Sequence, residues 1–160
     1  MKKLSSKEDV VYVHENFLTD EECDKYFNMI KDIGYSPKNL PWAERTIDIS
    51  NDPIVEKVTK YLEKRFKLEL KPSQVQLQNH HVNSWARFHV HDHGGREKIK
   101  YNSLIYLNEN FLGGNFVTSK GIDIKPKKGM LTFFNGQTVH HGVRTVLQND
   151  RKTIIFWWKE

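Results

Sequence analysis

The chain has 160 residues, of which 38% are hydrophobic and 28% charged, and its formal net charge is +5. This length and composition are typical of one globular domain, and the apolar runs are far shorter than the about 20 residues that cross a bilayer. The single cysteine, Cys23, excludes an internal disulfide and agrees with a reducing compartment. Residues 1–9 carry charge without a following apolar stretch, so we predict no signal peptide and expect a cytoplasmic protein.

Two amphipathic helices are predicted in the N-terminal part of the chain. The first covers residues 20–32, because Thr19 and Glu22 form the sequence pattern of a helix start and apolar residues follow at helical spacing. The second covers residues 53–66, with Pro53 in its first turn and an apolar stripe along one face. We expect these helices to support a strand-rich part that follows them.

From residue 73 onward, short runs of β-branched and aromatic residues alternate with turns rich in Gly, Asn and Pro. About eight short strands favour a mainly β fold, a jelly roll or double-sheet barrel braced by the N-terminal helices. We expect a single domain, residues 1–160, in which residues 1–72 are a helical support and residues 73–160 form the jelly-roll core. The predicted strands cover residues 74–82, 85–91, 101–107, 115–118, 122–125, 129–134, 138–146 and 152–158.

Histidines are concentrated in the second half of the chain, where seven of the eight lie between positions 80 and 141. Residues two apart in a strand point to the same face, so His89 and His91 should project together. Neutral imidazole binds iron(II), zinc, nickel or copper, and a ligand from a distant strand would complete one face of the ion. The pair His140 and His141, at the end of a later strand, is the obvious source. Isolated histidines usually have no such role, but this combination favours a metal site.

Arg151 stands at the start of the last predicted strand, which reads as buried. An arginine in such a position can bind a carboxylate through two parallel hydrogen bonds. A surface ion pair is the commoner role of arginine. Together with the histidine cluster, however, Arg151 favours a site that binds both a metal and a carboxylate.

Several segments of the chain follow one another in an order and spacing that resemble a known family. They are YNSLIYLN (101–108), NFLGGNF (110–116), IKPKKGMLTFF (124–134), HGVRTV (141–146) and RKTIIFW (151–157), preceded by ENFLTDEEC (15–23). In these segments the chain resembles the iron(II)- and 2-oxoglutarate-dependent oxygenases, and within them the small prolyl-4-hydroxylase-like proteins, including phage-borne ones. The resemblance implies a double-stranded β-helix core of the jelly-roll or cupin type, with Fe(II), 2-oxoglutarate as cosubstrate, and dioxygen.

The resemblance also implies roles for individual residues. His141 corresponds to the distal iron ligand of the family. Arg151, ten residues later, corresponds to the residue that binds the far carboxylate of 2-oxoglutarate. Tyr106 corresponds to a tyrosine that borders this cosubstrate, so Arg151 and Tyr106 are the expected cosubstrate-binding residues.

The chain departs from the family at the proximal ligands, where the family has a His-x-Asp motif and this sequence has none. His89 and His91 are the preferred ligands here, because His93 is followed by two glycines that turn the chain away. Asp92 is the alternative carboxylate ligand if a bulge rotates it inward. A third histidine in place of the carboxylate leaves the site one negative charge short and should alter its choice of metal.

The leading hypothesis is therefore a dioxygenase that uses iron(II) and 2-oxoglutarate to hydroxylate an aliphatic C–H. By resemblance, the target is a peptidyl proline or another protein side chain. The lysines are dispersed and not interleaved with aromatic residues, which disfavours a nucleic-acid substrate. The alternatives are a catalytically impaired jelly-roll binding module and a three-histidine cupin dioxygenase that does not use 2-oxoglutarate and gives Arg151 no role.

Overall fold

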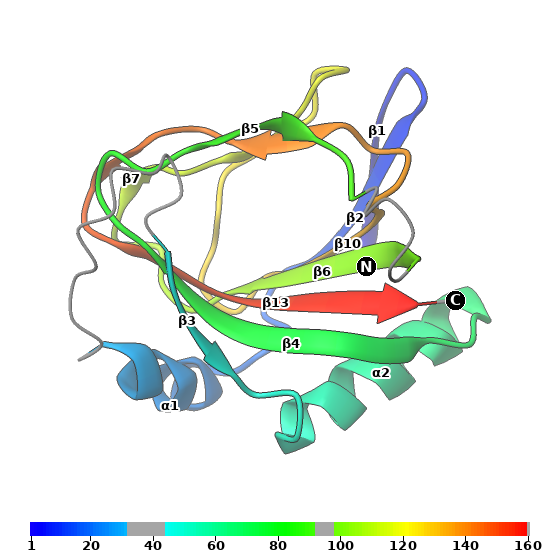
Figure 1. Ribbon diagram of the computed structural model, residues 1–160, viewed down its shortest axis with the longest axis horizontal. Coiled ribbons are helices and arrows are strands. Elements are labelled where there is room, and N and C mark those ends of the chain that lie inside the picture. The colour runs from blue at the N-terminus through cyan, green and yellow to red at the C-terminus, as the bar shows by residue number, and fades with distance from the viewer. Residues whose placement is uncertain (32–43, 92–97, 160) are drawn as a thin grey trace.

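The computed structural model describes residues 1–31, 44–91 and 98–159, in which a large antiparallel sheet faces a smaller one (Figure 1). The large sheet has the order β1 (Lys2–Ser6), β2 (Asp9–His14), β10 (Leu131–Asn135), β6 (Ile99–Tyr106), β13 (Arg151–Lys159), β4 (Lys71–His80) and β3 (Glu44–Asp48). The small sheet has the order β5 (Ala86–His89), β11 (His141–Val143), β8 (Phe116–Thr118) and β9 (Asp123–Ile124), and a third pair joins β12 (Val146–Gln148) to β7 (Leu112–Gly113). The predicted jelly-roll core with N-terminal helices is confirmed.

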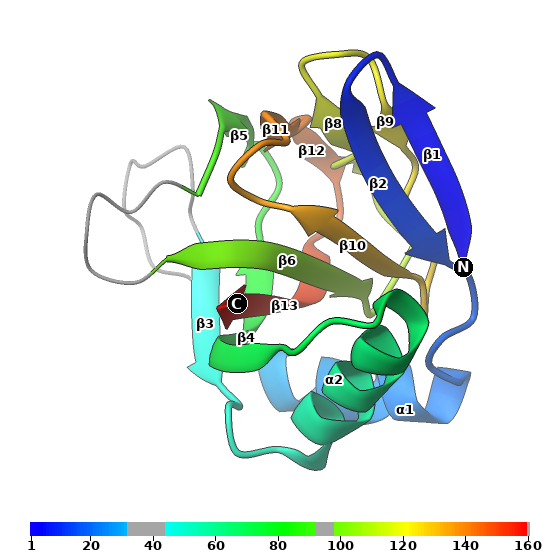
Figure 2. The ribbon, with the colours of Figure 1, turned by 90° about the vertical axis from the view of Figure 1, so that its right-hand side faces the viewer.

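Both predicted helices are present and lie on the outer side of the large sheet (Figure 2). Helix α1 (Asp20–Ile30) begins with reciprocal hydrogen bonds between Thr19 and Glu22, and it ends two residues before the predicted boundary. Helix α2 (Pro53–Phe66) is capped by Asp52, whose carboxylate accepts hydrogen bonds from the Ile54 backbone and from the Tyr26 hydroxyl of α1. No helix in the described residues is long and apolar enough to span a membrane.

The central strand β13 separates an apolar core from the interior of the jelly roll. Ile154, Phe156 and Trp158 are fully buried in the core that the two helices cover. The alternate residues of β13 point to the opposite side, toward the small sheet, as the period of two in a strand requires. The odd-numbered residues of β13 therefore face the space between the two sheets.

The N-terminal part differs from the predicted helical support, because it also contributes three strands to the large sheet. β1 and β2 form a hairpin, and β2 pairs with β10. β3 pairs with β4 at the other edge of the sheet. These strands are short, and β2 and β3 take their places in the sheet by pairing with strands far along the chain, so local sequence patterns did not reveal them. The predicted strand 138–146 is also divided, into β11 and β12.

Gly129 connects the sheet to the segment that enters α1. Its carbonyl oxygen accepts hydrogen bonds from the backbone of Phe17 (2.9 Å) and Leu18 (3.2 Å), and its N–H donates to the carbonyl oxygen of Tyr106 (2.8 Å). Its φ of +77° lies in the left-handed region that favours glycine. A Cβ at this position would lie 2.5 Å from the carbonyl oxygen of Leu18.

We predict that Gly129→Ala lowers the free energy of unfolding more than Gly121→Ala does. Gly121 also has a positive φ, +101°, but a Cβ there would meet only the Ser6 hydroxyl at 3.5 Å. The control therefore carries the backbone cost alone, about 1–2 kcal/mol, and Gly129→Ala adds the clash with Leu18. Urea unfolding of the two variants measures the difference, and equal losses would contradict it.

Candidate metal centre and cosubstrate cavity

Three histidines that the sequence analysis named converge between the two sheets. His89 ends β5 and lies opposite His141, the first residue of β11, in the antiparallel register. His91 follows His89 by two residues, and its backbone N–H donates to the carbonyl oxygen of Gly136 (2.8 Å). One ligand atom from each of the three side chains lies within 4.8 Å of the others.

Hydrogen bonds fix which ring nitrogen of each histidine faces the centre of this cluster. In each ring Nδ1 lies next to a carbonyl-type oxygen, which can only accept, so Nδ1 carries the hydrogen and Nε2 keeps its lone pair. The Asn102 amide is oriented by its own N–H, which donates to the carbonyl oxygen of Phe156 (3.3 Å). The three acceptors are Arg87 O for His89 (2.9 Å), Asn102 Oδ1 for His91 (2.6 Å) and Val139 O for His141 (2.8 Å).

This donor set fits a divalent transition metal. The Nε2 atoms of His89 and His91 are 3.2 Å apart, so one ion can contact both of them. Imidazole nitrogen is a good ligand for Fe(II), Ni(II), Cu(II) and Zn(II). The Nδ1 hydrogen bonds provide the outer contacts that orient metal-binding imidazoles in proteins.

His141 is held neutral by its surroundings. It is 5% exposed, and its ring packs against those of Phe116 (centroids 5.5 Å apart) and Phe134 (4.7 Å). Burial lowers the pKa of His141 to about 3, and the neighbouring histidines act in the same direction. At neutral pH the side chain therefore has no proton to lose before it binds a metal.

The three histidines open into a cavity of about 140 Å³ that the large sheet closes from the other side. A cavity of roughly 150 Å³ accommodates a molecule of the size of benzene, so there is room for a small ligand beside the histidines. From the large sheet, the cavity is lined by Gln78, His80, Leu104, Phe134, Arg151, Ile155 and Trp157.

Arg151 is buried in the cavity wall, with 1% of its surface exposed. Its Nε donates to the carbonyl oxygen of Gly114 (3.0 Å), and its guanidinium lies 5.2 Å from the centre of the Tyr106 ring. A Cβ at Gly114 would lie 2.9 Å from the Arg151 side chain, so this close approach requires glycine. Burial raises the pKa of the Tyr106 hydroxyl, although the arginine opposes this shift, so the tyrosine remains a neutral hydrogen-bond donor.

His80 lies directly opposite Arg151 in the pairing of β4 with β13. Burial, followed by the charge of Arg151, lowers the pKa of His80 to about 3. Among the described residues that line the cavity, Arg151 is therefore the only one with a permanent charge. A small anion that enters the cavity is attracted to this end of it.

The backbone around Arg151 is held by the side chain of Asn108. Its Nδ2 donates to the carbonyl oxygen of Asp150 (2.8 Å), and its Oδ1 accepts from the N–H of Lys152 (3.0 Å). The two bonds bracket Arg151 on both sides.

Thr153, two residues later on the same face of β13, is fully buried.

The sequence analysis named the three histidines, Arg151 and Tyr106, and the structure brings these residues to one cavity or its wall. It missed His80, Asn102 and Thr153. The period of two along β13 could have identified Thr153, whereas Asn102 and His80 are recognised only once the strands are paired. Asp92, the predicted alternative ligand, and His93 lie outside the described residues.

Residues 75–159 match the family model described as the 2OG-Fe(II) oxygenase superfamily. The chain belongs to this superfamily. Membership in the 2OG-Fe(II) oxygenase superfamily confirms the resemblance that the sequence segments indicated, and it implies Fe(II) and 2-oxoglutarate as metal and cosubstrate. The histidine cluster and the buried arginine are the features of this chain that fit these two groups.

Solved structures of oxygenases of this kind share the fold. The viral collagen prolyl hydroxylase of Paramecium Bursaria Chlorella virus-1, solved as a 2OG complex, is 19% identical with a TM-score of 0.74, over 93% of this chain and 95% of the other. A prolyl-4-hydroxylase of Pseudomonas putida is 14% identical with a TM-score of 0.76, over 96% and 94%. A relative found by sequence is prolyl 3-hydroxylase 2 of Rattus norvegicus, which is 34% identical over 65 residues. These residues are 36% of this chain and only 9% of that protein.

We predict that Asn102→Leu weakens metal binding about 10- to 100-fold, because His91 loses the acceptor that orients its ring. Asn102→Asp keeps an acceptor beside His91 and should retain most of the affinity. Asn115→Leu, at an asparagine whose side chain donates to the exposed Asp123 carboxylate, is the control. Anaerobic calorimetric titration with Fe(II) measures the affinities, and circular dichroism verifies the fold. Equal affinity in Asn102→Leu and the control would contradict the prediction.

We also predict that the metal-free protein loses stability as the pH falls from about 6.5 toward 3. In the unfolded chain His80 and His141 take up protons near pH 6.5, whereas in the folded protein they do so only near pH 3. The unfolded state therefore binds more protons in this window, and each histidine lowers the unfolding free energy by up to about 1.4 kcal/mol per pH unit. Urea unfolding between pH 7 and 5 should give a shallower slope for His80→Gln than for His140→Gln, an exposed control.

Proposed function

We propose that this protein is an Fe(II)- and 2-oxoglutarate-dependent hydroxylase, with His89, His91 and His141 as the metal ligands. The observation that carries the proposal is the presence, in one cavity, of three inward-facing Nε2 atoms and a buried arginine. A metal alone would explain the histidines but not the cost of burying Arg151 beside them. A cosubstrate that has one metal-chelating end and one free carboxylate explains both.

The three imidazoles hold the metal from one side and leave coordination positions for other ligands. When bound, Fe(II) and 2-oxoglutarate activate dioxygen, with one oxygen atom going to the substrate C–H and the other to succinate as CO₂ is released. The protein's own contribution is to fix the imidazole tautomers. The hydrogen bonds of Asn102, Val139 and Arg87 do this before any metal binds.

Arg151 binds the far carboxylate of 2-oxoglutarate, and Tyr106 and Thr153 assist it. A guanidinium pairs with a carboxylate through two charge-assisted hydrogen bonds. The Tyr106 hydroxyl is held in its neutral, donating form. The Thr153 hydroxyl is buried and has no hydrogen-bond partner in the described part of the chain, so it is available as a further donor. His80 is neutral and does not compete as a second charge.

The substrate that we propose is a prolyl or other aliphatic side chain of a peptide or protein. Next to the histidines, the cavity wall includes Ile155 and the half-buried Trp157, which suit an apolar group. The structural relatives include an enzyme named a collagen prolyl hydroxylase, and a Trichoplax adhaerens prolyl hydroxylase solved with a hypoxia inducible factor peptide fragment. The latter is 16% identical with a TM-score of 0.75, over 96% of this chain and 84% of the other.

Calorimetric titration of the anaerobic, metal-free protein with Fe(II) and then 2-oxoglutarate tests the proposal. We expect 2-oxoglutarate to bind only after the metal. Arg151→Ala should weaken 2-oxoglutarate binding about 100-fold, because hydrogen bonds to a charged group contribute about 1.5–3 kcal/mol each, while Fe(II) affinity is retained. Arg65→Ala, at an exposed arginine of α2, is the matched control.

His141→Ala should lose the binding of both ligands, and succinate formation with a proline-containing peptide should disappear in both variants. Unchanged 2-oxoglutarate affinity in Arg151→Ala would contradict the assigned role of the arginine. Metal binding without any 2-oxoglutarate binding would instead favour a three-histidine dioxygenase, and failure to bind either ligand would favour a binding module.

A further inference from the structure

Exposed apolar side chains gather on the outer face of the small sheet. Five large hydrophobic residues in the described part of the chain are exposed, and one of them, Met29, lies on α1. Trp85 (44% exposed), Phe88 (46%) and Leu147 (64%) line one surface groove, and Leu112 (58%) adjoins it in the sequence. A cluster of exposed apolar side chains on a protein surface is typical of a binding site, whereas single exposed hydrophobic residues are ordinary.

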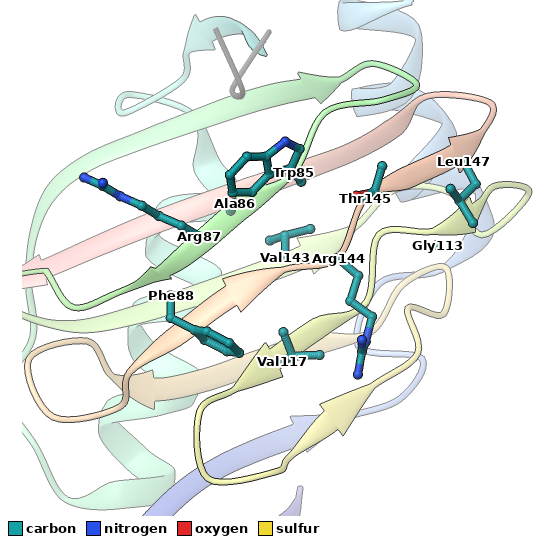
Figure 3. Close-up of a pocket in the computed structure, with 10 residues that line it drawn as sticks. All are labelled: Trp85, Ala86, Arg87, Phe88, Gly113, Val117, Val143, Arg144, Thr145 and Leu147. Carbon is teal, nitrogen blue, oxygen red and sulfur yellow. The ribbon is translucent and has the colours of Figure 1, made fainter.

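The groove has a volume of about 610 Å³ and runs across β5, β11 and β8 (Figure 3). Figure 3 shows Val143 near its middle, with Trp85 and Phe88 from the β5 side and Leu147 at the other end. Ala86 and Val143 line both this groove and the histidine cavity. On β8, Val117 lines the groove and its neighbour Phe116 lines the histidine cavity. Because successive residues of a strand point to opposite faces, the groove lies on the outer side of the small sheet.

Two arginines give the groove a positive charge. Arg87 and Arg144 extend from opposite sides of Val143 in Figure 3, and both are exposed. The Arg144 guanidinium bonds to the Asp123 carboxylate (3.1 Å), but this pair is itself 61% and 42% exposed and retains access to other charges. Tryptophan and arginine are the residues most enriched among those that dominate the energy of protein interfaces.

We propose that this groove docks an extended, acidic peptide segment of a partner protein, with apolar side chains in the hollow and carboxylates on Arg87 and Arg144. The hollow shape suits an inserted segment better than a flat partner surface. A second copy of this chain is a poorer occupant, because it would bring the same two arginines to the interface and the chain has a net charge of +5. A protein docked here is held one strand layer away from the histidine cavity without occupying it.

Fluorescence anisotropy with two dye-labelled peptides tests the proposal. One has ten residues of alternating leucine and glutamate, and in the other glutamine replaces every glutamate. In low-salt buffer the glutamate peptide should bind about tenfold more tightly than the glutamine peptide. The double variant Arg87→Ala/Arg144→Ala should abolish this preference, and Trp85→Ala/Leu147→Ser should abolish binding of both peptides.

Met29→Ser and Arg65→Ala are the matched controls, since they remove an exposed hydrophobic residue and an exposed arginine away from the groove. The measurement uses metal-free protein and is independent of the proposed oxygenase activity, and an unchanged far-UV circular dichroism spectrum verifies that each variant is folded. A glutamate preference that persists without the two arginines, or binding that persists in Trp85→Ala/Leu147→Ser, would overturn the proposal. Sedimentation velocity that shows a dimer abolished by Leu147→Ser would overturn it in favour of self-association.

Discussion

The pairing of β13 with β4 and β6 is the constraint on which both the core and the cavity depend. Its residues alternate between the two sides of the sheet, so the register that buries Phe156 and Trp158 under the helices also turns Arg151 and Thr153 toward the histidines. A slip of one residue would exchange the two sets, placing a guanidinium in the apolar core. The burial of the core residues therefore selects the register that builds the cavity.

The buried guanidinium of Arg151 needs support from the rest of the wall, because burying a charge costs free energy unless polar partners surround it. Gly114 supplies a carbonyl oxygen and the space to reach it, and the Tyr106 ring faces the positive charge. Asn108 fixes the backbone on either side of the arginine. These contacts hold the side chain in place before a ligand arrives, which reduces the ordering that ligand binding itself must achieve.

Local patterns in the sequence were sufficient for the elements that carry the proposed chemistry. The cap at Thr19 predicted α1, and the period of two in the predicted strand 85–91 indicated that His89 and His91 share a face. What the sequence did not reveal depends on partners distant in the chain. The places of β2 and β3 in the large sheet depend on the distant strands β10 and β4, and Asn102 becomes a partner of His91 only when β6 lies beneath it. The carboxylate alternative, Asp92, lies outside the described residues.

The charge of the proposed metal centre follows from these contacts. Among the described residues, the ligands that converge are three neutral imidazoles, so a divalent ion held by them keeps its two positive charges, and Arg151 adds a third. The dianion of 2-oxoglutarate compensates two of these three positive charges. Neither of its two ends has another cationic partner in the described cavity wall. Its affinity should therefore depend on the metal more strongly than in a site where a ligating carboxylate has already neutralised part of the charge. With three imidazoles as its ligands, the proposed centre therefore couples metal and cosubstrate binding strongly, and the two sheets set the shape of the cavity.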